Sequence, residues 1–176
     1  FAAFMIVIGH FATKGGAAYI EFGTNQLVAQ IVSVGGKLGV NLFIIISSYF
    51  LYAADFKISR IIRVWFETFF YSAGVCLIFI LFRGDSVIVS NLILLKCLFP
   101  IFGEPYWYVS AYIGFLVMHP ILKKIISSLS RNAFRYLLLA LCFMFSICPM
   151  VFVWANNLYC NNLAWFLFVY LLIGYF

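Results

Sequence analysis

One histidine interrupts the apolar run FMIVIGHF, residues 4–11, near the start of the chain. Polar side chains inside such runs are costly to bury in lipid and are therefore candidates for function. Lys14 follows His10 by about one helical turn, and a nearby cation disfavours the charged imidazolium form. A neutral imidazole can act as a general base. The alternative is a structural histidine that hydrogen-bonds between helices or reaches toward the membrane surface, and spacing alone leaves both open.

A second group of polar residues shares one face of a predicted helix. Its members are Arg60, Arg63, Glu67 and Tyr71, separated by three, four and four residues. Helical periodicity places all of them on the same side, and Arg63 can form an ion pair with Glu67. Guanidinium groups suit phosphate, so this face can bind an anion. The alternative is a pair of arginine anchors at the membrane surface with a structural ion pair.

Weaker signals come from two other helices. Asn41, Ser48 and Tyr52 are spaced to form a polar line on one helical face. Hydrogen bonding between helices explains each of them singly. His119 precedes Pro120, and we interpret it as a residue at the membrane interface with no catalytic role.

The elements that carry these residues are predicted to be membrane-spanning helices. The chain is 66% hydrophobic and 9% charged, whereas soluble domains are about 45–50% apolar and about 25% charged. Long apolar runs that do not alternate favour α-helices over a β-barrel. We therefore predict an all-α polytopic transmembrane bundle of about six segments, the first and last partial: Phe1–Ala12, Leu38–Ala54, Val64–Phe82, Tyr106–Leu122, Tyr136–Trp154 and Leu163–Phe176.

Two further apolar stretches are not counted as spans. Ser86–Phe102 is interrupted by polar residues and followed by proline and glycine, so we predict an interfacial or re-entrant segment. Gln26–Val34 is predicted to be a short amphipathic stretch at the membrane interface.

The basic residues set the predicted orientation. With six segments, seven of the eleven lie on one side, in short loops: Lys57, Arg60, Arg63, Lys123, Lys124, Arg131 and Arg135. Lys14, Lys37, Arg83 and Lys96 lie on the other. The positive-inside rule places the seven in the cytoplasm, in a multi-pass protein of the plasma (inner) membrane. The net charge of +6 is thereby explained without nucleic-acid binding.

Cysteine and motif patterns exclude several other classes. No CxxC spacing occurs among the five cysteines, and no metal site is predicted. Cys97 and Cys160 fall in loops predicted to share a face, so a disulfide between them is an open option. The chain has no GxSxG, Walker, GxGxxG or HExxH motif.

Four stretches, in order over residues 1–125, together resemble the acyltransferase-3 family of membrane enzymes. They are His10 with its apolar surroundings, GVNLFIIISSYFL (39–51), KISRIIRVW (57–65) and PYWYVSAYIGFLVMHPIL (105–122). The last three resemble the family's second-helix signature, its RxxR segment and its aromatic helix. Residues 1–176 are then expected to form part of a single membrane-embedded acyltransferase domain, cut at both ends and inactive by itself.

The resemblance implies an O-acyltransferase, with acetyl as the expected group. Such enzymes move an acyl group from a cytoplasmic acyl-CoA, here acetyl-CoA as co-substrate, to a hydroxyl of a cell-surface polysaccharide or related glycan. No bound cofactor is expected. By resemblance, His10 is the catalytic base and Arg60 and Arg63 bind the donor. Glu67, Asn41 and Trp107 are supporting candidates.

Two alternatives stay open. The polar stripes also fit a transporter or exporter of a glycan or small molecule, although we see no inverted repeat or matched broken helices. The second alternative is that the chain is an inactive member of the family, because Ser48 stands where the family usually has glycine.

Overall fold

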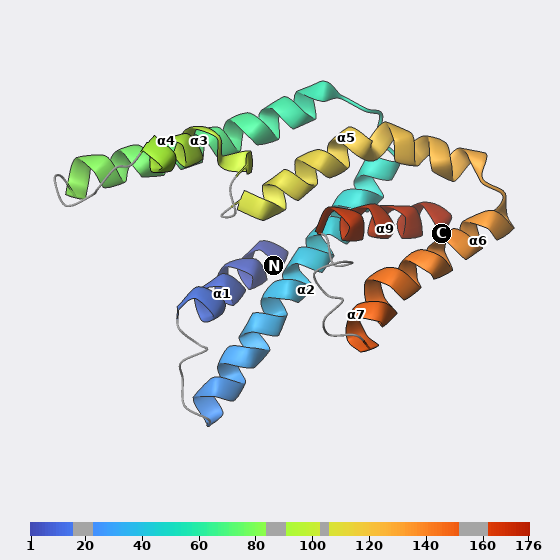
Figure 1. Cartoon of the computed structure of the whole chain (residues 1–176), viewed down its shortest axis with the longest axis horizontal. Coiled ribbons are helices and arrows are strands. Elements are labelled where there is room, and N and C mark those ends of the chain that lie inside the picture. Colours follow the sequence, from blue (N-terminus) through green and yellow to red (C-terminus); the bar gives the residue numbers. More distant parts are fainter. Residues whose placement is uncertain (16–22, 84–90, 103–105, 152–161) are drawn as a thin grey trace. The chain divides into compact units, whose positions relative to one another are not determined.

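Helices are the only regular elements in the part of the chain that the computed structural model describes (Figure 1). The described residues are 1–15, 23–83, 91–102, 106–151 and 162–176. Three of these helices are long and apolar enough to cross a membrane, and two shorter ones are also apolar. The predicted all-α membrane fold is confirmed. Contacts divide the chain into two compact units, residues 1–54 with Phe176, and residues 55–175.

The first unit is a pair of helices, α1 (Ala2–Lys14) and α2 (Thr24–Tyr52). The prediction of a separate interfacial stretch at Gln26–Val34 is wrong, because these residues form the first third of α2. At 29 residues α2 is roughly 43 Å long. The helix runs through Gly35 and Gly36 without interruption.

Glycines let the backbones of α1 and α2 touch. A Cβ atom built on Gly9 would lie 2.5 Å from Cα of Gly36, and one on Gly39 would lie 2.7 Å from the carbonyl oxygen of Ala2. Gly9 thus faces Gly36 while Ala2 faces Gly39, so the helices run antiparallel. Close approach through small residues is a common way for helices to associate in lipid, where no hydrophobic force holds them together.

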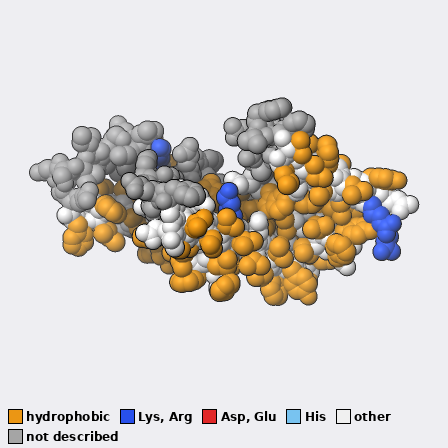
Figure 2. All heavy atoms as spheres, turned by 90° about the horizontal axis from the view of Figure 1, so that it is seen from below, with side chains coloured by type: hydrophobic (Ala, Val, Ile, Leu, Met, Phe, Trp, Pro, Cys, Tyr) orange, Lys and Arg blue, Asp and Glu red, His pale blue; other side chains and the backbone are white. Residues whose placement is uncertain are grey.

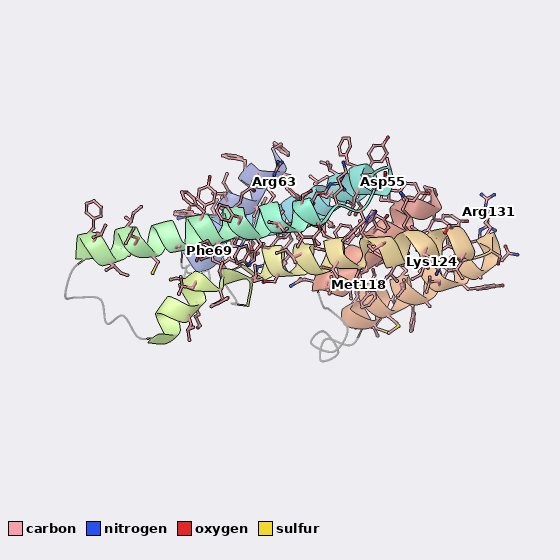
Figure 3. The ribbon with its side chains drawn as sticks, turned by 90° about the horizontal axis from the view of Figure 1, so that it is seen from above. Asp55, Arg63, Phe69, Met118, Lys124 and Arg131 are labelled. Carbon is pink, nitrogen blue, oxygen red and sulfur yellow. The ribbon has the colours of Figure 1, made fainter. Side chains whose placement is uncertain are left out.

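The second unit begins with α3 (Ile58–Arg83) and α5 (Trp107–Ser128). They run antiparallel, as Figure 3 shows. Asp55, just before α3, accordingly pairs with Lys123 in the C-terminal half of α5. Between them in sequence lie α4 (Asn91–Leu98) and the 3-10 turn η3 (Pro100–Phe102). With eight residues, α4 is too short to cross a bilayer. Residues 86–90 of the stretch predicted to be interfacial or re-entrant lie outside the described residues.

The C-terminal part of this unit contains a helix with a local change of winding. The segment starts as α6 (Arg131–Cys142), capped by the hydroxyl of Ser130, which accepts from the amide of Ala133 at 3.3 Å. It continues through the π-helical turn η5 (Phe143–Ile147) into α7 (Cys148–Val151). The last helix is α9 (Asn162–Tyr175). Trp154, a predicted end of a span, lies outside the described residues.

Aromatic rings form the core where α5 packs on α9. Phe115 is fully buried and lies edge-on to Phe166 and Tyr170, with ring centroids 6.5 and 5.5 Å away. His119 belongs to this core: it is 1% exposed and lies edge-on to Tyr170 at 5.6 Å. The prediction that His119 is an interface residue is therefore wrong. The helix does not end at Pro120 but continues to Ser128, so His119 lies well inside it.

Many large apolar side chains outside this core are exposed on the surface of the described residues. Figure 2 views the molecule from below and shows hydrophobic side chains over most of the described surface on that side, with Lys and Arg in a few places. On α3, large apolar residues such as Phe66, Phe70 and Phe79 are exposed. A water-soluble monomer rarely exposes contiguous apolar areas of this kind, so this surface is suited to lipid.

Candidate functional site

His10 presents its imidazole on the surface of α1. It is exposed, and its Nδ1 lies 2.9 Å from the carbonyl oxygen of Ile6, one turn earlier. A carbonyl oxygen can only accept a hydrogen bond, so this contact places the proton on Nδ1. In a neutral ring this tautomer leaves the lone pair on Nε2, which is the requirement for a base. The side chain of Lys14, expected to bias this ring toward neutrality, lies outside the described side chains.

The residue before His10 fixes where the ring sits. Gly9 is buried against Gly36 at the crossing with α2. His10, the next residue, therefore projects from the level of α1 at which the two backbones are in contact.

Asn41 lies in the same unit but at another level. It is half-buried on α2, five residues beyond Gly36. At 1.5 Å per residue, and with the helices antiparallel, Asn41 lies roughly 9 Å along the axis from the level of His10. The structure therefore does not bring the two side chains together.

The donor-binding candidates lie at the start of α3, in the second unit. Arg60 donates from Nη1 to the backbone carbonyl of Asp55 at 3.0 Å. The carboxylate of Asp55 pairs with Nζ of Lys123 at 3.8 Å. Asp55 thus joins the basic start of α3 to the basic end of α5. Sequence reasoning missed it, since its role depends on two partners that only folding brings near.

Arg63 and Glu67 are both exposed on α3 (Arg63 is labelled in Figure 3). The ion pair that their spacing allows is not formed, as the two make no salt bridge within the described chain. Holding two long, solvent-exposed side chains in one geometry has an entropic cost that a surface pair hardly offsets. The guanidinium of Arg63 is therefore not committed to Glu67.

Trp107 lies at the other end of the α3–α5 pair. It is the first residue of α5, half-buried, with its ring edge-on to Tyr108 at 5.8 Å. Lys123 follows sixteen residues later, roughly 24 Å along the helix. Because Lys123 lies beside Asp55, Trp107 is remote from Arg60 and Arg63. Among the predicted residues of this unit, Arg60, Arg63 and Glu67 lie within two turns of each other on α3, and Trp107 lies away from them.

The surface position of the Asp55–Lys123 pair sets its effect on stability. Asp55 has 92% of its side chain exposed and Lys123 has 43%. Exposed pairs contribute about 0–1 kcal/mol. Asp55→Asn is therefore expected to lower the free energy of unfolding by less than about 1 kcal/mol, measured by thermal unfolding in detergent. A larger loss would mean that the pair is shielded from water.

No group of three or more His, Cys, Asp or Glu within the described ranges could hold a metal ion. Cys160, one half of the disulfide considered from the sequence, lies outside the described residues. The main candidate site residues in the described ranges are His10 in the first unit and the pair Arg60 and Arg63 in the second.

The comparison with known families bears on what these residues do. A family model described as an acyltransferase domain matches residues 1–176. The chain belongs to the acyltransferase-3 family. No curated protein and no solved structure matches it. Membership confirms the resemblance, which four stretches over residues 1–125 carried, and extends it to the C-terminal helices. It makes the chain part of a membrane acyltransferase family and favours that class over a transporter.

Proposed function

We propose that the chain carries the catalytic base and donor-binding arginines of a membrane-embedded O-acyltransferase. The donor is an acyl-CoA, and acetyl-CoA is the donor that we expect. The acceptor is a hydroxyl of a cell-surface polysaccharide or related glycan. The observation that carries the proposal is the hydrogen bond between Nδ1 of His10 and the carbonyl of Ile6. Family membership supports the class of reaction.

The chemistry needs a base of this kind. A sugar hydroxyl attacks the carbonyl carbon of the thioester, and its proton must leave as the C–O bond forms. Nε2 of His10 takes this proton. The C–S bond then breaks and the thiolate of coenzyme A leaves. A proton on Nδ1, donated to the carbonyl of Ile6, supports the proposal because it leaves Nε2 of the neutral ring as the accepting nitrogen.

Donor binding is assigned to the start of α3. An acyl-CoA carries phosphate groups, and arginine forks bind phosphate through paired hydrogen bonds. Arg60 already uses part of its guanidinium on Asp55. Arg63 is exposed and lies one turn further along α3. We assign the main phosphate contact to Arg63 and a positioning role to Arg60.

The proposed orientation has the basic loops in the cytoplasm of a cell with an inner (plasma) membrane. Support comes from the antiparallel pairing of α3 and α5, because it places Arg60 and Lys123 at the same end. A single cytoplasmic end then holds both basic loops, as the positive-inside rule requires. The same end would meet the cytoplasmic acyl-CoA.

The test is transfer of labelled acetyl to surface polysaccharide by cells that carry the full-length protein. The proposal expects transfer that depends on His10 and on Arg63. Unchanged transfer after both His10→Ala and Arg63→Ala would contradict it. Substrate flux across vesicles without covalent acyl transfer would support the transporter alternative instead.

Arg63→Ala is expected to raise KM for acyl-CoA by roughly 10- to 100-fold. This range corresponds to the loss of one hydrogen-bonded contact with a charged group, about 1.5–3 kcal/mol. Arg63→Lys should recover only part of the loss, since it keeps the charge but not the fork. Initial rates in membranes at varied acyl-CoA measure both. Lys124→Ala, an exposed cation at the same end, is the matched control and should leave KM within about twofold.

A further inference from the structure

Two arginines at the start of α6 and a tyrosine at the end of α9 form a cationic cluster, Arg131, Arg135 and Tyr175. Nε of Arg135 donates a hydrogen bond to the hydroxyl of Tyr175 over 2.6 Å. The ring of Tyr175 in turn lies edge-on to the buried ring of Phe134, with centroids 5.5 Å apart. Arg131 lies one turn before Arg135 on the same face of α6, and both arginines are exposed. The bond through Nε orients the guanidinium of Arg135, whose other donors are on its two Nη atoms.

The cluster has no acidic side chain to balance its charge. Residues 105–176 contain no Asp or Glu. Within the described chain Asp55 pairs with Lys123, and neither arginine of the cluster forms a salt bridge with an Asp or Glu side chain. Two guanidinium groups one turn apart repel each other unless an anion lies between them. Their forked donors match the oxygens of a phosphate group, so phosphate is the chemistry that the cluster fits.

The cluster lies at the end of this unit that is expected to meet the membrane surface. Helix α5 ends at Ser128 and α6 begins at Arg131, so the cluster shares this end with Lys123 and Lys124 (Lys124 and Arg131 are labelled in Figure 3). It is the end proposed above to face the cytoplasm. The cytoplasmic leaflet carries anionic lipids, and basic sites between helices on this side bind their headgroups.

The same face of α6 becomes apolar beyond the arginines. Leu139 and Phe143 follow Arg135 at intervals of four residues, and they are 66% and 54% exposed. They lie roughly 6 and 12 Å further along the helix axis than Arg135, at 1.5 Å per residue. A cationic site that continues into an exposed apolar stripe matches a ligand with an anionic head and acyl chains. A free phosphate ion would make no use of the stripe.

We propose that the cluster binds the phosphate of an anionic phospholipid, whose acyl chains lie along Leu139 and Phe143. Arg131 and Arg135 contact the phosphate oxygens, and Tyr175 holds the guanidinium of Arg135 in position. The site goes beyond the proposed acyl transfer and uses none of the residues assigned to it. Its placement at the cytoplasmic surface rests on the proposed orientation.

The experiment measures lipid binding to the full-length protein, purified in detergent, by native mass spectrometry. The probe is phosphatidylglycerol, and phosphatidylcholine with the same acyl chains is the comparison lipid. Wild type is expected to bind phosphatidylglycerol in preference to phosphatidylcholine. Arg131→Gln combined with Arg135→Gln should weaken this binding roughly 30-fold, at about fivefold for each basic residue near an anionic surface.

Lys37→Gln combined with Lys96→Gln is the matched control. It removes the same charge at two exposed positions, on α2 and α4, and should leave the affinity for phosphatidylglycerol unchanged. Tyr175→Phe keeps the ring against Phe134 but loses the hydroxyl. It should weaken binding by about 2- to 10-fold, as expected for the loss of one hydrogen bond.

The apolar part of the site is tested in wild type with a photoactivatable phosphatidylglycerol that carries a diazirine in an acyl chain. The label is expected in the peptide that contains Leu139 and Phe143. Because this measurement needs no variant, it decides the question even if a substituted protein fails to fold.

Four results would overturn the proposal. They are equal binding of the two lipids, equal loss in the arginine and lysine double variants, a label confined to other helices, and displacement of the lipid by equimolar inorganic phosphate or acetyl-CoA. The last result would assign the cluster to a free phosphate or to the acyl donor. Lipid binding is measured without acyl transfer, so an inactive or wrongly assigned His10 leaves it unchanged, and the two proposals can fail separately.

Discussion

His10→Ala is expected to reduce transfer of labelled acetyl by roughly 10²- to 10⁴-fold, the usual contribution of a positioned general base. The loss should appear in kcat, because the base acts on the hydroxyl proton in the transition state. KM for acyl-CoA should change little, since the donor arginines are on another helix. Single-turnover and steady-state assays in membranes with the full-length protein separate the two effects.

Two further variants distinguish a base from a structural histidine. His10→Gln can still donate a hydrogen bond to the carbonyl of Ile6 but cannot take a proton at neutral pH. It should therefore be as inactive as His10→Ala while remaining normally folded. Phe11→Ala alters the adjacent exposed residue and should keep activity within a few-fold. Activity restored by glutamine would show that His10 acts only through its hydrogen bond.

The second large effect is expected at the crossing of α1 and α2. In Gly9→Ala, the new Cβ would lie 2.5 Å from Cα and 3.0 Å from the backbone nitrogen of Gly36. Backbone atoms cannot rotate away as a side chain can, so the helices must separate. Overpacking of this kind costs about 1–3 kcal/mol. Thermal unfolding in detergent should show a Tm lower by roughly 2–12 °C, at 2–4 °C per kcal/mol for a chain of this size.

Gly74→Ala is the matched control. It makes the same substitution in the interior of α3, where an added Cβ meets nothing within 4 Å. Alanine favours the helix over glycine by up to about 1 kcal/mol, so the Tm should hold or rise. Equal stability of the two variants would mean that α1 and α2 do not cross at Gly9. Gly9→Ala should also reduce transfer, because it displaces His10.

Helix positions were predictable from sequence because the apolar runs are long. Continuous hydrophobicity located most of the spans, and the polar interruptions in Ser86–Phe102 kept that stretch from being counted as one. The extent of α2 was not predictable in the same way. Gly35 and Gly36 weaken a helix when it is considered alone, and only the partner helix explains why they are tolerated. A property of two segments in contact cannot be seen in either one.

The candidate site was partly predictable for a similar reason. His10, Arg60 and Arg63 stand out because charged and polar groups are rare in this chain. Their partners do not stand out in the sequence. A backbone carbonyl accepts from His10, and Asp55 contacts both Arg60 and Lys123, which is far away in sequence. His119 was misjudged because a following proline often ends a helix, whereas α5 is held by its packing against α9.

The π-helical turn at Phe143–Ile147 has a consequence for how this segment tolerates change in length. A turn of this kind holds one residue more than regular winding requires. Because each residue of an α-helix turns the chain by about 100°, an added or deleted residue normally redirects every later side chain. A one-residue deletion in η5 could be absorbed by converting the turn to regular α-helix. Length variation among relatives is therefore expected to concentrate at this turn, where it leaves the α5–α9 core untouched.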